Sequence, residues 1–399
     1  MTYPTKKLGE ICEIVGGGTP STGISTYWEG DIVWVTPKDL GQLSSGEISD
    51  TVKKITPQGM GKSSAKLLPV GSVILSSRAP IGYLAINTVP MATNQGCRSF
   101  VCGPDIFNKY LYYFLIKSRD YLQTLGSGST FLEVSGSRLK EIEIPMPSVG
   151  EQRKIVVRIE KQFTKIDEAA RLRAESQEAV AALLPAFLHE IISTTEAKEW
   201  GEKSLGDIAL GVKSGFACGK YNEVSDGVVH LRTHNVDLSG ELNLDKIVRI
   251  PAKFVDTEVF NLRKGDVVFN NTNSAELVGK SIIIREDLPY AFSNHLTRIR
   301  PRTDAVLSEW LLQTLHLYWR DKVFEKMCKK WIGQAGINQT ALKQIKIPLP
   351  PLAEQKEIVK KLDALSEKVR VLQALQSQQA ADLKALKQSI LYEAFSCTM

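Results

Sequence analysis

Residues 139–155 are LKEIEIPMPSVGEQRKI, and residues 342–358 repeat this stretch as LKQIKIPLPPLAEQKEI at a constant offset of 203. Two shorter stretches that precede it are also repeated in the second half of the chain. LGEI at 8–11 returns as LGDI at 205–208, and GSVIL at 71–75 returns as GDVVF at 265–269. Similarity that recurs at nearly one spacing along a chain indicates an internal repeat. The chain of 399 residues is therefore predicted to contain two copies of one unit, each of about 200 residues.

Each copy starts with a part that has the composition of short strands and turns. β-Branched runs are separated by Gly, Pro and Asn, which favours strands joined by loops. These runs are DIVWVTP, GSVILSS and LAINTV in the first copy, and DGVVHLR, GDVVFNN and GKSIIIR in the second. Apolar residues at helical spacing predict one helix near 106–124 and another near 305–327. The fold class is predicted to be α+β.

Each copy ends in a long helix with the pattern of a coiled coil. Positions 358, 362, 365, 369, 372, 376, 379, 383, 386 and 390 step by four and three, and all are apolar except Gln376 and Gln379. The first copy has a looser version: Ile155, Ile159, Ile166, Arg173, Val180, Leu183 and Phe187. Because a globular part separates the helices in sequence, the two are predicted to pair with each other in antiparallel orientation.

Five segments follow from these patterns. Ser148 followed by Glu151 is a helix-start signature and fixes the first boundary. The predicted segments are a first globular domain over 1–147, a long helix over 148–193, a linker over 194–203, a second globular domain over 204–350, and a C-terminal long helix over 351–399.

The composition is that of a soluble globular protein, with 43% hydrophobic and 24% charged residues. No apolar run approaches the roughly 18 residues of a membrane span, and the first residues lack a signal peptide, so we expect a cytoplasmic protein without membrane contact. The formal net charge is +6. Residues 1–147 carry a net +2, residues 205–346 a net +4, and the helical segments none. Any attraction to phosphates is expected on the globular domains.

The sequence contains none of the catalytic motifs that its short patterns suggest. Gly-Lys-Ser occurs at 61–63 and 279–281, but the glycine that a P-loop requires five positions earlier is Thr56 or Ser274. His230 and His234 lack the spacing of a zinc site, and the six cysteines form no metal-binding pattern. No Asn-Pro-Pro-Tyr or Asp-Pro-Pro-Tyr motif of an amino-methyltransferase is found. We predict no catalytic residue and no metal site.

Polar loops recur at matching places in both copies. Asn, Gln and Arg are side chains that bind base edges in the major groove. The alternative, for any single residue, is an ordinary turn. Related loops that stay polar but change identity favour a duplicated reader with two different targets. The candidate DNA-binding residues are Thr36, Lys38, Arg78, Asn94 and Gln95, then Arg232, His234, Asn235, Asn270, Asn271, Asn273, Asn294 and His295.

Three motifs carry a resemblance to a known family. The pattern I-P-x-P-x-x-x-E-Q-x-x-I at 144–155 and 347–358 resembles the specificity (S) subunit of type I restriction–modification systems, and LSSRAPIGYLAI at 75–86 and TNQG at 93–96 resemble its target recognition domains. The second domain departs from this pattern, since it has NNTNSAELVGK at 270–280.

The resemblance implies a non-catalytic subunit. Two target recognition domains, separated by a long antiparallel two-helix coiled coil, would bind a bipartite, asymmetric sequence in double-stranded DNA. Two methyltransferase (M) subunits would dock around the coiled coil and methylate adenine N6, and two restriction (R) subunits would join in a system that also cleaves. No cofactor is expected on this chain, because S-adenosylmethionine, ATP and Mg would belong to the partners.

Other classes of function stay open at this stage. A methylation-only system without a nuclease would use the same chain. A coiled-coil scaffold that binds only proteins would account for the helices but not for two diverged copies of a domain with polar loops. A self-contained methyltransferase is disfavoured by the missing motifs.

Overall fold

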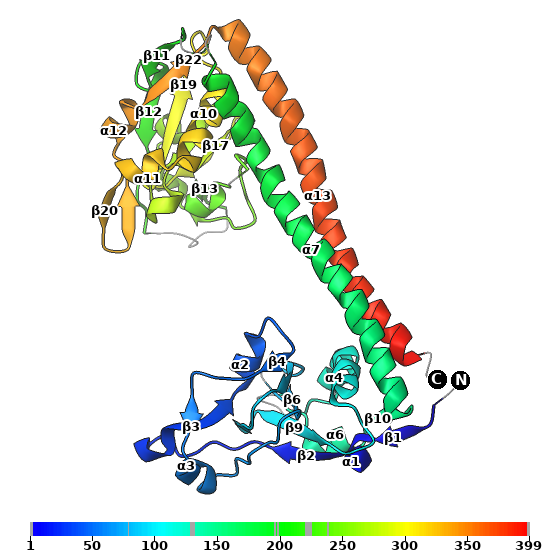
Figure 1. Cartoon of the computed structure of the whole chain (residues 1–399). Helices are drawn as coiled ribbons and strands as arrows, with labels where there is room; N and C mark the ends of the chain where they lie inside the picture. The colour runs from blue at the N-terminus through cyan, green and yellow to red at the C-terminus, as the bar shows by residue number, and fades with distance from the viewer. Residues whose placement is uncertain are drawn as a thin grey trace. The chain divides into compact units, whose positions relative to one another are not determined.

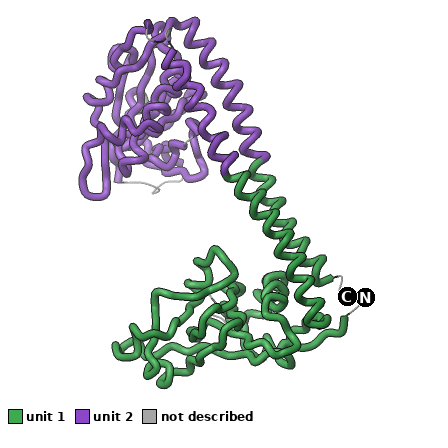
Figure 2. Tube along the Cα trace, viewed as in Figure 1, with its two compact units in different colours: residues 1–174, 376–399 green, residues 175–375 purple. Residues whose placement is uncertain are grey.

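Figure 1 shows the computed structural model of the chain, which describes residues 3–78, 80–127, 132–194, 197, 199–219, 226–237 and 239–396. The chain forms two compact units (Figure 2). Unit 1 comprises residues 1–174 and 376–399, and unit 2 comprises residues 175–375. Each unit therefore contains one globular domain together with part of each long helix.

Unit 1 alternates short strands and short helices before its long helix. Its strands are β1 (Thr5–Lys7), β2 (Cys12–Gly16), β3 (Trp28–Val35), β4 (Glu47–Ile48), β5 (Lys54–Ile55), β6 (Val73–Ser76), β7 (Leu84–Asn87), β8 (Ala92–Thr93), β9 (Cys97–Cys102) and β10 (Glu143–Pro145). Its helices are α1 (Leu8–Ile11), α2 (Pro37–Gly41), α3 (Pro57–Gly61), α4 (Asn108–Lys117), α5 (Arg119–Thr124) and α6 (Gly136–Lys140), followed by the long helix α7 (Val149–Ile192).

Unit 2 repeats this arrangement. Its strands are β11 (Gly201–Ser204), β12 (Ala209–Ser214), β13 (Val228–Leu231), β14 (Arg249–Ile250), β15 (Val267–Asn270), β16 (Thr272–Asn273), β17 (Ser281–Ile283), β18 (Ala291–Phe292), β19 (Leu296–Pro301), β20 (Lys329–Trp331), β21 (Gln334–Gly336) and β22 (Lys346–Leu349). Its helices are α9 (Thr257–Phe260), α10 (Ser308–Arg320), α11 (Val323–Met327) and α12 (Gln339–Lys343), followed by the long helix α13 (Leu352–Ser396).

The strand order confirms the internal duplication. The main sheet of unit 1 has the order β2-β9-β6-β7-β4, and that of unit 2 has the order β12-β19-β15-β17. The small sheets correspond as well, because β5-β3-β8 and β14-β13-β18 share one antiparallel and one parallel pairing. All six runs that the sequence analysis predicted as strands contain one.

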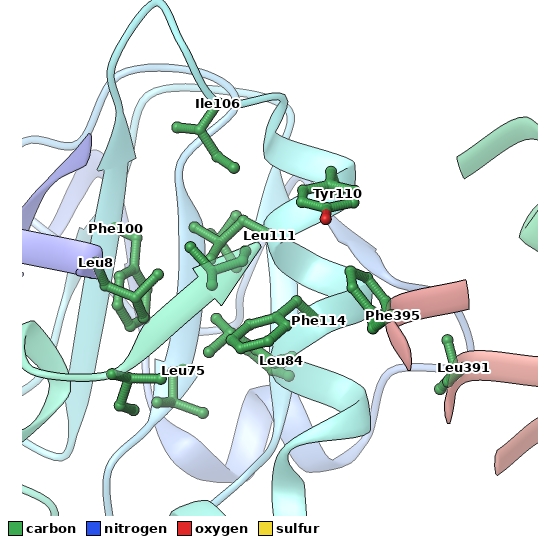
Figure 3. Packing of buried hydrophobic residues seen from close by; sticks show 14 of the residues in the cluster. Leu8, Leu75, Leu84, Phe100, Ile106, Tyr110, Leu111, Phe114, Leu391 and Phe395 are labelled. Atoms are coloured by element: carbon green, nitrogen blue, oxygen red, sulfur yellow. The ribbon is translucent and has the colours of Figure 1, made fainter. Parts of the chain in front are cut away.

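Alternation along the strands of the main sheet gives each of its faces a separate core. In β6, Val73 and Leu75 point to the cluster beneath α4, while Ile74 points to a second cluster on the opposite face. Figure 3 shows the first cluster, in which Tyr110 and Phe114 of α4 meet Phe395 at the end of α13. The C-terminal turns of the long helix thus belong to the core of unit 1.

The helices predicted near 106–124 and 305–327 are present, but each is broken. The first divides into α4 and α5 at Ser118, and the second into α10 and α11 at Asp321 and Lys322. Lys322 adopts a left-handed conformation with φ of 59°, which an uninterrupted helix does not allow. The apolar spacing did not reveal the breaks because the apolar residues on both sides of each break pack into the same core.

The long helices pair in antiparallel orientation in each unit. In unit 1, Asp167 of α7 forms an ion pair with Lys387 of α13, and Arg173 donates a hydrogen bond of 3.1 Å from Nη1 to the carbonyl oxygen of Gln376. In unit 2, Leu188 of α7 packs in one cluster with Ile358 and Leu362 of α13. The predicted coiled-coil pairing is confirmed.

The predicted seam is wrong at several positions. Gln379 is exposed, as are Leu372, Leu386 and Leu183, whereas Gln376 is buried. Beyond Gln376, the predicted positions Leu383 and Ile390 are covered, whereas Ala380 and Lys387 are covered in place of Gln379 and Leu386, one residue later than a strict heptad gives. A helix with 3.6 residues per turn drifts by about 20° per heptad, so some contacts move to the next residue along such a length.

A buried glutamine anchors each long helix to its globular domain. The Gln152 side chain is fully buried; it accepts a hydrogen bond from the backbone N–H of Phe107 and donates to the carbonyl oxygens of Asp105 and Pro147. Gln355 makes the equivalent three bonds with Leu307, Ala305 and Pro350. Phe107 and Leu307 immediately precede α4 and α10. The glutamine of the repeated motif therefore joins the long helix to the segment that precedes α4 or α10.

Candidate nucleic-acid interface

The three polar loops predicted in unit 1 converge at one place. Thr36 caps α2, and its hydroxyl donates to the Asp39 carboxylate at 2.6 Å. The backbone N–H of Asn94 donates to the carbonyl oxygen of Val35 at 2.9 Å, which ties the second loop to the first. A Cβ atom built on Gly96 would lie 3.0 Å from Nε of Arg78, which belongs to the third loop.

The side chains on these three loops differ in solvent exposure and in hydrogen bonding. Lys38 and Gln95 are exposed, and Arg78 and Asn94 are half-buried. The Asn94 side chain accepts a hydrogen bond from the N–H of Gly96 at 2.9 Å, and Gln95 accepts one from the Thr19 hydroxyl. Lys38 and Gln95 are therefore accessible, and Arg78 is accessible in part, on loops that hydrogen bonds hold in place.

Arg78 belongs to a charged cluster that the sequence analysis did not identify. Arg98 of β9 lies 2.9 Å from Glu133, measured from Nη2 to Oε1, and Arg78 lies 3.8 Å from the same carboxylate. Gln95 and these three residues help to line a cavity of about 420 Å³. One carboxylate faces two guanidinium groups, so the cavity keeps a positive charge and suits a phosphate or a guanine edge.

Unit 2 builds the equivalent loops on the same backbone frame. The backbone N–H of Arg232 donates to the Asn235 side chain at 2.8 Å, as that of Thr36 donates to Asp39 at 2.8 Å. The N–H of Ser293 donates to the carbonyl oxygen of Leu231, as Asn94 does to Val35. The positions that face outward differ: Lys38 in unit 1 corresponds to His234 in unit 2, and both side chains are exposed.

Three predicted residues of unit 2 have buried side chains that hold the loops. Asn235 donates to the carbonyl oxygens of Asn243 and Lys246. Asn270 donates to that of Leu277, and Asn271 donates to the Thr297 hydroxyl at 2.7 Å. These amides act inside the protein and are not available at its surface. The accessible candidates are His234 and Asn294, which are exposed, and Arg232, Asn273 and His295, which are half-buried.

The histidine and cysteine patterns do not form a metal site within the described residues, where no group of three or more His, Cys, Asp or Glu side chains is placed to hold an ion. His230 is fully buried and packs against Phe216 with ring centroids 5.1 Å apart. Burial and, to a smaller extent, the nearby Arg232 lower the pKa of His230 to about 4, so the imidazole is neutral near pH 7. No helix in the described ranges has both the length and the apolarity that crossing a membrane requires.

Comparison with protein-family models identifies the family of this chain. The sequence model of the type I restriction modification DNA specificity domain matches this chain twice, over residues 2–175 and 197–379. The chain belongs to this family. Its two DNA specificity domains correspond to the duplication seen in the strand order, and each match extends from a globular domain into a long helix.

Relatives of this DNA specificity family include named subunits. The MjaIX specificity subunit of Methanocaldococcus jannaschii is 40% identical over 230 residues, which is 53% of this chain and 52% of that protein. The chain thus spans about half the length of that relative. The EcoKI specificity subunit of Escherichia coli is 23% identical over 88% of this chain and 80% of its own length.

Two solved structures share the fold. A chain from a study of complex assembly and conformational transition of a type I system has a TM-score of 0.78 at 22% identity and covers 100% of this chain and 98% of its own length. The HsdS subunit from Thermoanaerobacter tengcongensis has a TM-score of 0.57 at 22% identity over 100% of this chain and 97% of its own length.

Proposed function

We propose that this chain is the DNA-recognition subunit of a type I restriction–modification complex, in which each globular domain binds one half of a bipartite target. One observation carries the proposal. The two units hold equivalent loops with the same backbone hydrogen bonds, while the outward side chains on these loops differ, as Lys38 and His234 do. A duplicated frame with changed surface residues suits one binding mode applied to two different sequences.

We assign the reading surface to the accessible side chains. In unit 1 these are Lys38, Arg78 and Gln95, with Thr36 and Asn94 shaping their loops. In unit 2 they are Arg232, His234, Asn273, Asn294 and His295. The functional boundaries are proposed to be 1–147 and 204–350 for the two readers, with 194–203 as the linker.

The chemistry is proposed to reside in partners. Methyltransferase subunits, two of them in the arrangement that the family resemblance implies, would bind S-adenosylmethionine. In a restricting system two further subunits would use ATP and Mg. The proposal assigns to this chain the choice of DNA sequence and no chemical step.

A domain exchange tests the division of labour. Residues 204–346 are replaced by the corresponding domain of another family member, and the hybrid is expressed with its methyltransferase partner. Sequencing of modified adenines is expected to show one altered half-site and one unaltered half-site. A motif changed in both halves, or in neither, would overturn the proposal.

A further inference from the structure

The β20–β21 hairpin of unit 2 carries an exposed apolar tip. Trp331 and Gln334 are the last paired residues, so Ile332 and Gly333 form a two-residue turn, with Gly333 at φ of 75°. Ile332 is 104% exposed and Trp331 is 55% exposed. Figure 1 shows the hairpin, labelled β20, projecting from the rest of unit 2.

The base of the hairpin explains its folding, whereas its tip does not contribute to the core. Ala335 and Ile337 belong to the hydrophobic core of unit 2 and are buried. The Trp331 ring lies across the hairpin, since a Cβ atom built on Gly336 would lie 3.3 Å from it. The ring therefore packs toward the base of the hairpin and stiffens it, whereas Ile332 buries no surface within the chain.

Positive charge lies on β20 and on the end of α11, which precedes it. Lys326, Lys329 and Lys330 are exposed, and residues 326–336 contain no acidic residue. Among the residues that the structure describes, no carboxylate lies within ion-pair distance of these three ammonium groups. The hairpin thus combines an apolar point with unpaired cations, which suits a polyanion that also offers apolar surface.

The hairpin is continuous with the proposed reading surface. β21 pairs with β16, where Asn273 faces Ala335 and Thr272 faces Gly336. The backbone N–H of Ile337 donates to the carbonyl oxygen of Asn271 at 2.9 Å. One small sheet therefore carries both the polar loop of unit 2 and the exposed tip, and a duplex bound at Asn273 would lie close to the lysines.

We propose that the β20–β21 hairpin is a DNA-contacting wedge of unit 2. Lys329 and Lys330 bind backbone phosphates, and Ile332, supported by Trp331, inserts into the groove against the base pairs. Apolar side chains that enter a groove in this way unstack base steps and fix the position of the protein on the duplex. This inference rests on the proposed function and adds to it a contact outside the polar loops.

The experiment uses the full chain assembled with its methyltransferase partner and a fluorescent duplex that contains the motif found by methylome sequencing. The variants are W331A/I332S and K329Q/K330Q. The control is L210S, which removes an apolar side chain that is 71% exposed on β12, a strand of a different sheet from the hairpin. Circular dichroism and melting curves check that each variant folds.

The wedge variant is expected to bind at least about 5-fold more weakly, because the tip no longer buries apolar surface in the groove. The unmodified protein should raise the fluorescence of 2-aminopurine placed in the half-site of unit 2, because an inserted side chain unstacks the base. The wedge variant should lose this rise. In the lysine variant, the slope of log affinity against log salt concentration is expected to become less negative by nearly two. Each lost phosphate contact accounts for about one counterion. L210S should bind like the unmodified protein.

Two results would overturn the wedge while leaving the proposed function intact. One is a wedge variant that binds the motif as tightly as the unmodified protein does. The other is a variant that keeps its DNA affinity but no longer assembles with the methyltransferase subunit, which would make the tip a protein interface. Failure of the unmodified complex to prefer its motif over a scrambled duplex would instead reject the proposed function itself.

Discussion

A side chain that binds a base edge must be held in one place and still be accessible, and Arg78 meets both conditions. Its backbone forms a bridge to Glu133, its guanidinium lies 3.8 Å from the Glu133 carboxylate, and its side chain remains 32% exposed. A planar guanidinium fixed in this way can bind the O6 and N7 atoms of guanine in a bidentate manner.

Replacing Arg78 by alanine is expected to weaken binding of the cognate duplex by about 1–3 kcal/mol and to relax the base preference at one position of the motif. Binding measured on duplexes that differ at single positions tests this. The control is Lys165→Ala, which removes an exposed cation of α7. A uniform loss on all duplexes together with a flatter salt dependence would assign Arg78 to a phosphate contact instead.

His230 makes the stability of unit 2 depend on pH. Burial lowers its pKa to about 4 in the folded chain, whereas an unfolded histidine titrates near 6.5. Between these values the unfolded state binds a proton that the folded state does not, so the free energy of unfolding decreases as the pH falls from about 6.5 toward 4. Burial also lowers the pKa of His316, which adds to the same trend.

Substituting His230 by phenylalanine should therefore make the loss of stability between pH 7 and pH 5 smaller than in the unmodified protein, without abolishing it. Urea unfolding at a series of pH values measures this slope. His234→Asn changes an exposed histidine and serves as the control. Equal slopes for His230→Phe and the unmodified protein would show that His230 is not held in its neutral form.

The elements that local patterns define were predictable, and the residues that act across elements were not. The strands and paired long helices follow from periodicity, which is a property of neighbouring residues. Glu133 and Arg98 are brought to Arg78 only by strand pairing. Polarity alone did not distinguish Asn271, whose amide is buried, from Asn294, whose side chain is exposed, because asparagine favours turns in either setting.

At the level of the elements, the buried glutamines are the joints between the long helices and the domains. Gln152→Leu removes three hydrogen bonds and leaves the N–H of Phe107 and two carbonyl oxygens without that partner. We expect the free energy of unfolding of unit 1 to fall by about 2–4 kcal/mol. Gln355→Leu should have the same effect on unit 2, since its contacts are equivalent.

Chemical denaturation followed by circular dichroism measures this effect. Gln162→Leu is the matched control, because Gln162 lies exposed on α7 and the change introduces the same side chain. A loss of stability no larger for Gln152→Leu than for Gln162→Leu would show that the three hydrogen bonds contribute little.

On the scale of the whole molecule, the two repeats meet at equivalent positions of their long helices. Arg173 and Gln376 are separated by the repeat offset of 203 residues, and they are hydrogen-bonded to each other. In an antiparallel pair of similar helices, equivalent residues face each other only at the midpoint of the pairing. Residues added at this point lengthen both helices equally and keep all other pairs in register.

Four residues inserted after Arg173 and four after Gln376 add about 6 Å to each helix. Because successive base pairs are about 3.4 Å apart, we expect the unspecified gap between the half-sites to lengthen by one or two base pairs while both half-site sequences stay the same. Methylome sequencing of the variant gives the gap directly. The same insertion in α7 alone should shift the helices out of register and reduce assembly with the methyltransferase. A matched insertion that methylates the original motif with its original gap would mean that the partner subunits, and not α7 and α13, set the spacing.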